Sequence, residues 1–352
     1  MAEDLTLPTV RALPWLHPLW QRLTAPDAPA AHALLFIGPA GIGKRQLAEA
    51  LAARILCDQP QEDGHACGNC PACRLHAAGN HPDFFRIVPE GEQADEAANA
   101  QEDAGAAKKA SRQIVIEQIR QLQAALTSTG HQSERRPVLI DPLEAMNAFT
   151  ANALLKLLEE PPAGCRFLLV CAAPSRLPAT ILSRCQCWRL AAPAPDAAAA
   201  LLQGDEARAL LALNGGAPLA AQRQSEQGWA PLMSRFVQEL SALPQSGALA
   251  LAARWEAWLK QRDTQDTAFA LPNLVDWLHR WVADLALLRL GAQVRFFPAE
   301  RARLQRLAQH LPIAAILTCY NDLAQIRRAA THPLNARLLL EDMLLRYARL
   351  TA

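Results

Sequence analysis

Residues 32–45 read His-Ala-Leu-Leu-Phe-Ile-Gly-Pro-Ala-Gly-Ile-Gly-Lys-Arg, and this stretch decides the fold. Its first six residues form an apolar run that predicts a buried strand, and the spacing of Leu47, Leu51 and Ile55 behind it predicts a helix. Between them, residues 38–45 match the phosphate-binding pattern G-x-x-x-x-G-K-[ST] at every position except the last. The strand, the loop and the helix together predict an α/β nucleotide-binding fold.

The glycines and the lysine of this loop carry the expected chemistry. Gly38, Gly41 and Gly43 allow backbone N–H groups to curl around phosphates, and the ammonium of Lys44 can reach the β and γ oxygens. The last position of the pattern normally supplies the hydroxyl that holds Mg²⁺. Arg45 stands there instead, and it has no lone pair for a metal and carries a repelling charge. The loop is therefore built as a nucleotide site that lacks a part needed for hydrolysis.

The composition is that of an ordinary soluble globular protein. The chain has 352 residues, enough for two or three domains, with 51% hydrophobic and 20% charged residues and a net charge of +1. This charge argues against electrostatic capture of nucleic acid by the whole chain, although local patches stay open. The apolar runs are shorter than the roughly 18 residues of a transmembrane span, and residues 1–8 do not form a secretory signal. We therefore expect a cytoplasmic protein with no membrane partner.

Two further apolar runs predict buried strands. Residues 138–140 read Val-Leu-Ile and end at Asp141, and residues 167–171 read Phe-Leu-Leu-Val-Cys. A helical pattern covers residues 145–160 between them, and Pro161-Pro162 ends it. Strands that alternate with helices predict a parallel sheet with helices on both faces.

From Asp196 onward the chain shows helical patterns and no strand signal. Residues 271–285 carry an amphipathic stripe of leucine and tryptophan, for which Asn273 is the expected N-cap, and residues 338–350 repeat the pattern. Residues 243–247, Leu-Pro-Gln-Ser-Gly, predict a loop near a domain boundary. We therefore expect a helical region behind the α/β domain.

The segment from Glu90 to Asp103 has a different character. It holds six acids, no lysine or arginine, and few apolar anchors. This composition predicts a disordered surface insertion, and a partner-binding role stays open.

Four of the nine cysteines are spaced as metal ligands. Two-residue gaps separate Cys67, Cys70 and Cys73, and Cys57 lies ten residues before Cys67, so the backbone can bring four thiolates to one tetrahedral Zn²⁺. Four cysteines leave no open position for water, which makes the predicted site structural. Free cysteines, or a redox pair of Cys70 and Cys73, are the alternatives. Substitute ligands nearby are His65 and His76.

Several of these motifs coincide in one known family. The chain resembles bacterial clamp-loader subunits of the AAA+ class from about Pro14 through Cys187. The resemblance rests on the cysteine module behind the phosphate-loop helix, on the run Asn-Ala-Leu-Leu-Lys-Leu-Leu-Glu-Glu-Pro-Pro at residues 152–162, and on Ser183-Arg184-Cys185. The helical remainder matches more loosely.

The resemblance implies a domain organisation and a set of partners. The expected domains are an AAA+ RecA-like domain over residues 1–192 with its zinc module at 57–73, a small helical lid over residues 193–230, and a helical collar for oligomerisation over residues 231–352. The implied assembly is a hetero-oligomer with motor subunits (gamma/tau) and a clamp-opening delta subunit. It would load a sliding clamp onto primed DNA as part of a nucleotidyltransferase holoenzyme.

Motor subunits of that family differ from this chain at two positions of the ATPase site. They carry Ser or Thr where this chain has Arg45, and Asp-Glu where it has Asp141-Pro142. The Asp helps to hold Mg²⁺ and the Glu positions the attacking water, which a proline cannot do. Glu144, two residues farther on, is expected to be a solvated acid. The resemblance implies a stator subunit without ATPase activity; an ATP-hydrolysing motor is the alternative, and ATP binding without hydrolysis stays open.

The resemblance implies a catalytic role for Arg184. In clamp loaders the arginine of the Ser-Arg-Cys motif reaches into the ATP site of the neighbouring subunit, where it stabilises charge on the γ-phosphate. From the residues alone, a surface arginine at a helix end is the competing interpretation.

Three further points bear on the nucleotide site and its rivals. Trp15 stays open between a leftover adenine contact and ordinary packing. Residues 214–218 resemble the family's lid, but no arginine follows them directly, and Arg223 is five positions past Pro218. A third hypothesis is a zinc knuckle that binds nucleic acid. The scarcity of basic and aromatic residues around the cysteines argues against it.

Overall fold

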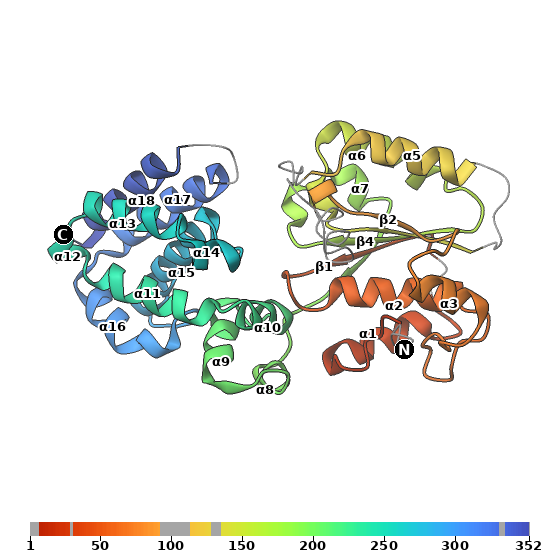
Figure 1. The fold of residues 1–352 in the computed structure, drawn as a ribbon, viewed down its shortest axis with the longest axis horizontal. Helices are drawn as coiled ribbons and strands as arrows, with labels where there is room; N and C mark the ends of the chain where they lie inside the picture. The colour runs from red at the N-terminus through yellow and green to blue at the C-terminus, as the bar shows by residue number, and fades with distance from the viewer. Residues whose placement is uncertain (1–6, 29–30, 92–112, 128–134, 331–334, 352) are drawn as a thin grey trace. The chain divides into compact units, whose positions relative to one another are not determined.

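The computed structural model describes residues 7–28, 31–91, 113–127, 135–330 and 335–351 (Figure 1). From residue 92 on, the predicted acidic insertion lies outside these residues. The chain divides into two compact units, residues 1–192 and 193–352. Each is described separately below.

The first unit is built on a parallel sheet of five strands in the order β2-β3-β4-β1-β5. The strands are β1 (Ala33–Ile37), β2 (Phe85–Ile87), β3 (Arg136–Ile140), β4 (Cys165–Cys171) and β5 (Gln186–Arg189). The three strands predicted from apolar runs are confirmed as β1, β3 and β4, the central strands. Because β1, β3 and β4 are buried at almost every position, they read as unbroken apolar runs.

Helices cover both faces of this sheet, as predicted. Figure 1 shows α1 (His17–Thr24), α2 (Lys44–Leu56) and α3 (Pro71–Ala77) on one face, and α5 (Ile116–Thr127), α6 (Ala148–Glu159) and α7 (Ala179–Leu182) on the other. Short 3₁₀ turns lie at Pro14–Leu16, Leu143–Ala145 and Pro174–Arg176. On the second face, apolar side chains of α5 and α6 join those of β1, β3 and β4 in one buried cluster. The carboxyl ends of β1, β3 and β4 therefore meet at one edge of a rigid sheet.

The helix predicted over residues 145–160 begins later than expected. Asn147 caps α6, since its side-chain oxygen accepts a hydrogen bond from the backbone N of Thr150 at 2.9 Å. An asparagine at this position competes with helical backbone before it and satisfies free N–H groups after it. The preceding residues therefore form the separate 3₁₀ turn Leu143–Ala145, which becomes important for Glu144 below.

The second unit contains only helices among its described residues. They are α8 (Pro195–Ala199), α9 (Gly204–Leu213), α10 (Pro218–Glu226), α11 (Trp229–Ser241), α12 (Leu243–Ser246), α13 (Ala248–Leu259), α14 (Arg262–Asp266), α15 (Leu271–Arg289), the 3₁₀ turn Pro298–Glu300, α16 (Arg301–His310), α17 (Ile313–Ala329) and α18 (Ala336–Thr351). In the part of the chain that the structure describes, no helix has the length and apolar character that crossing a membrane requires.

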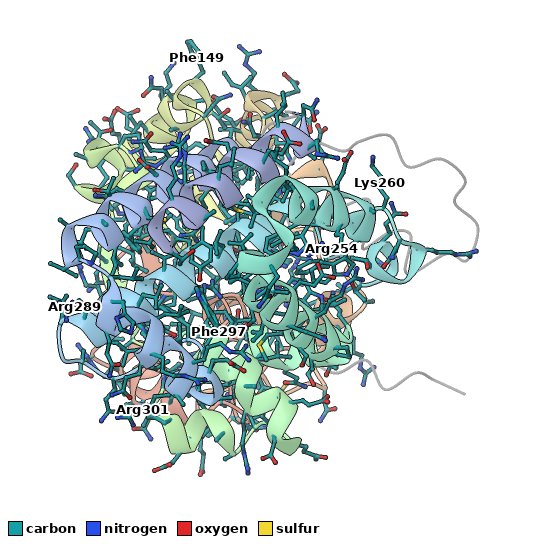
Figure 2. All side chains as sticks on the ribbon, turned by 90° about the vertical axis from the view of Figure 1, so that its left-hand side faces the viewer. Phe149, Arg254, Lys260, Arg289, Phe297 and Arg301 are labelled. Carbon is teal, nitrogen blue, oxygen red and sulfur yellow. The ribbon has the colours of Figure 1, made fainter. Side chains whose placement is uncertain are left out.

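The core of the second unit is aromatic. Four tryptophans are 1% exposed or less: Trp255, Trp258, Trp277 and Trp281. The indole N–H of Trp281 donates to the hydroxyl of Tyr347 at 2.9 Å, which satisfies both polar groups inside the core. Figure 2 shows Phe297 among the helices, while Lys260 and Arg301 lie at the surface. The stripe over residues 271–285 is core, as predicted.

Two local predictions in this unit were wrong. Asn273 does not cap α15; it occupies the third helical position, and its side-chain oxygen accepts from the backbone N of Ala270 at 2.9 Å. Residues 243–247 are not a loop but the short helix α12, because the buried side chain of Leu243 joins the core. Gly247, with a φ of 76°, then ends that helix.

Candidate nucleotide site, cysteine cluster and arginine

The loop between β1 and α2 has the backbone of a phosphate-binding loop. Gly41 and Gly43 have φ angles of 78° and 96°, a conformation that favours glycine. A Cβ at Gly38 would lie 2.3 Å from the carbonyl oxygen of Leu190, so only glycine fits there. The loop leads directly into the N-terminus of α2, the end of a helix at which phosphates bind. The three predicted glycines thus lie in one loop.

Lys44 lies inside this loop and not at its surface. Its side chain is buried, with 5% of the residue exposed, and Nζ donates to the carbonyl oxygen of Pro39 at 2.5 Å. Burial lowers the pKa of Lys44, and the charges of Asp141, Glu144 and Cys171 oppose this shift. Asp141 and Glu144, which follow β3, are therefore near enough for their charges to favour the ammonium form of Lys44.

Arg45 and Asp141 form an ion pair. Nε of Arg45 contacts Oδ2 of Asp141, whose side chain is 9% exposed at the end of β3. These are the two positions that hold Mg²⁺ in an active phosphate-loop ATPase. A guanidinium therefore contacts the carboxylate that a metal would need. The sequence predicted the missing hydroxyl but not this pairing.

Glu144 corrects another prediction, because it is not a solvated acid. Its Oε1 accepts backbone N–H groups from Ala172 at 2.8 Å and Ala173 at 3.1 Å, just beyond the end of β4. The 3₁₀ turn Leu143–Ala145 directs the Glu144 side chain toward the sheet and not toward solvent as expected. Burial, followed by the charge of Glu144, raises the pKa of the Cys171 thiol to about 12. Glu144 thus satisfies backbone donors at the edge of the site.

Trp15 packs on the phosphate loop. Its indole N–H donates to the carbonyl oxygen of Ile42 at 2.9 Å, and the side chain is half-buried. This hydrogen bond ties Trp15 to the phosphate loop itself.

The four predicted cysteines come together. The Sγ atoms of Cys57, Cys67, Cys70 and Cys73 all lie within 4.8 Å of one another, and those of Cys67 and Cys73 are 3.9 Å apart. Tetrahedral Zn²⁺ with bonds of about 2.3 Å needs sulfur atoms roughly 3.8 Å apart, so this donor set fits a metal ion. The cluster joins the end of α2 to the start of α3.

Backbone N–H groups point at these sulfurs. Cys67 Sγ accepts from the backbone N of Asn69 and of Cys70, both at 3.4 Å, and the backbone N of Cys67 donates to Cys57 Sγ at 3.2 Å. These donors lower the pKa of Cys67 to about 7, first the N–H of Asn69 and then that of Cys70. Metals bind thiolates, and the loop favours that charge state at Cys67, whereas burial raises the pKa of Cys57 and of Cys73.

The two histidines near the cluster have other partners. The ring of His65 stacks on Trp20, with 4.4 Å between centroids, and its Nδ1 lies 3.2 Å from Asp63 Oδ2. The ring of His76 meets Phe84 edge-on at 4.7 Å, and burial lowers its pKa to about 4. Among the described residues, the cysteines form the metal-binding set without them.

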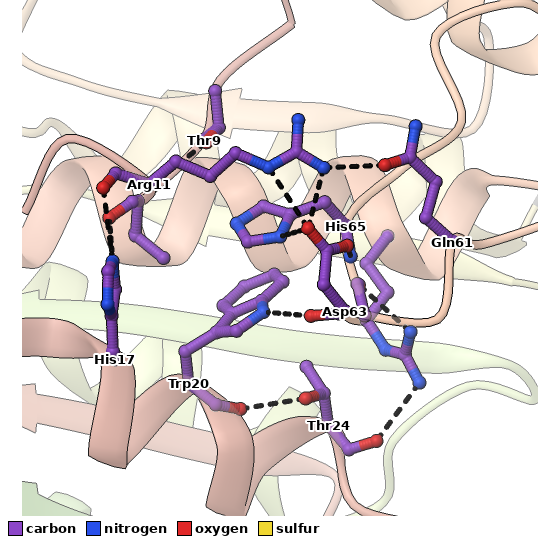
Figure 3. Close-up of polar contacts among 11 residues, drawn as sticks. Thr9, Arg11, His17, Trp20, Thr24, Gln61, Asp63 and His65 are labelled. Atoms are coloured by element: carbon purple, nitrogen blue, oxygen red, sulfur yellow. Dashed lines mark hydrogen bonds and ion pairs between the residues drawn. The ribbon is translucent and has the colours of Figure 1, made fainter. Parts of the chain in front are cut away.

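A polar network that no sequence pattern indicated ties residues 61–65, between the first two cysteines of the cluster, to Arg11 and α1 (Figure 3). Arg11 donates to Asp63 Oδ2 from Nε at 3.0 Å and from Nη2 at 2.7 Å, and to Gln61 Oε1 at 2.5 Å. The indole N–H of Trp20 donates to the carbonyl oxygen of Asp63 at 2.9 Å. Partners about 50 residues apart cannot be matched from spacing alone. The network holds the loop on α1.

Arg184 lies just after α7. Its Nη2 is 2.6 Å from Oε1 of Glu159, the last residue of α6, and Nη1 donates to the carbonyl oxygen of Thr180 at 3.0 Å. The side chain is 34% exposed. The guanidinium is thus accessible, and a carboxylate holds it.

Comparisons with known proteins identify the family. One family model, described as DNA polymerase III, delta subunit, matches residues 19–194, and a second, for the C terminal part of that subunit, matches residues 235–349. DNA polymerase III subunit delta' of Pseudomonas aeruginosa is 38% identical to this chain, with 96% of this chain and 97% of that protein covered. The chain belongs to the delta' family of DNA polymerase III subunits.

The chain is also similar to other DNA polymerase III subunits. Subunit delta' of Escherichia coli is 29% identical, with 96% of this chain and 95% of that protein covered. Subunit tau of Bacillus subtilis is 31% identical over 44% of this chain. A solved gamma subunit-related protein of Thermotoga maritima covers 97% of this chain at 19% identity, with a TM-score of 0.43. The resemblance to clamp-loader subunits seen in the motifs is confirmed.

Proposed function

We propose that this delta' family member is a stator subunit of a clamp loader and does not hydrolyse ATP itself. In this proposal it assembles with gamma/tau motor subunits and a delta subunit into a hetero-oligomer that loads a sliding clamp onto primed DNA. Its place of action would be the cytoplasm. The family membership supports the assembly, and the nucleotide site supports the absence of hydrolysis.

The observation that carries the proposal is the ion pair between Arg45 and Asp141. Mg²⁺ with ATP would have to displace a guanidinium from a buried carboxylate, and removing one partner of a buried ion pair is costly. No hydroxyl would replace it as a ligand, and Pro142 stands where motors carry the acid that orients water. The loop keeps Lys44 and its glycines, so we propose that any remaining phosphate binding is independent of Mg²⁺.

Arg184 is the group that the chain would contribute to chemistry elsewhere. An arginine donated to a neighbouring ATP site contributes about 10³–10⁵-fold to the rate in related enzymes. The partial exposure of Arg184 at the end of a short helix is compatible with such a reach.

The remaining parts of the proposal are structural. The four clustered cysteines would hold Zn²⁺, which would cross-link the end of α2 and the start of α3 when bound. Residues 193–230 would form a lid and residues 231–352 a collar. One hydrophobic cluster contains buried residues from both ranges, from Ala198 to Leu350, so we expect the lid and collar to unfold together.

The first experiment measures ATP turnover by the isolated chain. We expect none, because the metal position carries a cation. Turnover that disappears in a Lys44→Ala variant would overturn the stator proposal in favour of a motor.

The second experiment measures DNA-stimulated ATP turnover after reconstitution with motor and delta subunits. We expect Arg184→Ala to lower turnover at the neighbouring site by about 10³-fold or more. Arg176→Ala is the matched control, because Arg176 is also an exposed arginine of the first unit. If Arg184→Ala turns over like wild type, the arginine assignment fails.

A further inference from the structure

The guanidinium of Arg184 is held on one side and left available on the other. Its Nη2 is 2.6 Å from Glu159 Oε1, and Nη1 donates to the carbonyl oxygen of Thr180 at 3.0 Å and to Ser183 Oγ at 3.4 Å. An arginine has five N–H donors, so two remain after these three contacts. The side chain is thus fixed in direction and can still bind another acceptor.

The position of Glu159 is not explained by the stability of its own helix. It is the last residue of α6, where a carboxylate meets the negative end of the helix dipole. Pro161 and Pro162 stop the helix from continuing and so fix where this carboxylate stands. Arg184 is the cation that Glu159 meets among the described residues. The contact with Arg184 therefore explains the position of Glu159 better than the stability of α6 does.

We propose that Glu159 is a positioning residue for Arg184, an inference that rests on the proposed function of Arg184 as a donated arginine. A free arginine side chain samples many rotamers, and that freedom is lost when it binds a phosphate. Glu159 and Thr180 remove part of this freedom in advance, so that the guanidinium is already oriented when the neighbouring ATP reaches it. Glu159 itself acts through Arg184 and does not touch the nucleotide.

The exposure of the pair fits this role. The side chains of Arg184 and Glu159 are 34% and 48% exposed, so water screens their attraction. A screened carboxylate orients the guanidinium without neutralising it, and the more highly charged γ-phosphate still attracts the two remaining donors. A fully buried partner would compete with the phosphate.

The test measures DNA-stimulated ATP turnover of the reconstituted complex with variants of Glu159. We expect Glu159→Gln to lower kcat by about two- to fivefold, the range that exposed ion pairs support, with KM for ATP unchanged. Glu159→Asp, which keeps the charge, should recover part of this loss. The matched control is Glu160→Gln, because Glu160 is the adjacent exposed carboxylate and has no ion pair within the described residues. It should turn over like wild type.

A double variant separates positioning from a structural role. If Glu159 acts through Arg184, adding Glu159→Gln to Arg184→Ala causes no further loss of turnover. A further loss would contradict the inference, and so would a Glu159→Gln complex that turns over as fast as wild type or faster. Faster turnover would mean that Glu159 restrains the arginine. In these outcomes Arg184→Ala still lowers turnover, so the proposed role of Arg184 stands. If Arg184→Ala leaves turnover unchanged, both that role and the inference about Glu159 are overturned.

Discussion

Two arginine–carboxylate pairs in the first unit differ in the burial of the carboxylate, whereas their arginines are similarly exposed, at 32% for Arg45 and 34% for Arg184. Arg45 meets Asp141 at the carboxyl end of β3, where the Asp141 side chain is 9% exposed, whereas Arg184 meets Glu159 between the ends of α7 and α6 with both side chains a third or more exposed. Breaking a buried pair leaves a charge without water, while a screened pair is easily exchanged. An arginine–carboxylate ion pair therefore occupies the metal position at Asp141, whereas the pair with Glu159 leaves Arg184 available to another acceptor.

The largest effect should follow from removing the buried carboxylate. Asp141→Ala leaves Arg45 beside Lys44, two cations with one acid fewer, and we expect it to destabilise the first unit by about 2 kcal/mol, reduced from fully buried pairs because Arg45 is partly exposed. Hydrogen exchange of the amides in β1, β3 and β4 measures this for the first unit alone. Asp141→Asn is the control that keeps the shape. An unchanged exchange rate in Asp141→Ala would remove the contrast between the two pairs.

Replacing Arg45 tests whether this arginine keeps Mg²⁺ out of the nucleotide site. Arg45→Ser removes the guanidinium from Asp141 and supplies a hydroxyl, so we expect Mg²⁺ to strengthen ATP binding by about tenfold, or 1.4 kcal/mol, compared with the same variant in chelator. Arg45→Met removes the charge without adding a metal ligand, so Mg²⁺ should strengthen its ATP binding less than that of Arg45→Ser. Titration with a fluorescent ATP analogue measures both. Hydrolysis should stay absent because Pro142 cannot orient water. If Mg²⁺ has no effect on Arg45→Ser, Arg45 does not take the place of the metal.

The positions changed in these variants also show which features could be predicted from the sequence and which could not. The central strands, the helices on both faces and the cysteine cluster follow from local patterns, since apolar runs, proline stops and two-residue gaps act over short distances. The sequence could name Arg45 and Pro142 as altered positions and Asp141 as a retained one, because each stands in a recognisable motif. It could not predict their ion pair, or that between Arg184 and Glu159, because such contacts depend on which loops the sheet brings together. Glu144 was misjudged for a related reason: its 3₁₀ turn directs its side chain to the backbone beyond β4, a contact between segments that are 28 residues apart.

A third pair, between Arg11 and Asp63, extends the comparison to a more exposed case. Burial raises the pKa of Asp63, but the backbone N–H of His65 and the guanidinium of Arg11 outweigh it and hold that pKa at about 2. A carboxyl with a lowered folded pKa stabilises the fold above its unfolded value near pH 4 and loses this contribution as the pH falls through about 2. We expect Asp63→Asn to cost at most about 1 kcal/mol at pH 7, because both side chains are about half exposed.

Urea unfolding of wild type and Asp63→Asn at several pH values measures this contribution. The difference in unfolding free energy should be constant from pH 7 to 5 and should shrink as the pH falls below 4. Gln61→Ala removes the neutral partner of Arg11 and should show no such pH dependence. A difference that grows in acid would contradict the role of the Asp63 charge.

The smallest effect should come from the pair that we assign to function. Glu159→Ala should change the stability of the first unit by less than about 0.5 kcal/mol, because water screens the ion pair and a carboxylate at the end of α6 opposes the helix dipole. Hydrogen exchange of β1, β3 and β4, compared with Asp141→Ala in the same experiment, measures it. If Glu159→Ala destabilises the unit as much as Asp141→Ala does, the contact is structural, and its effect on Arg184 cannot be separated from folding. A near-neutral result alongside reduced turnover would mean that the exposure of the carboxylate partner, and not the identity of the charges, decides which arginine remains available to a neighbour.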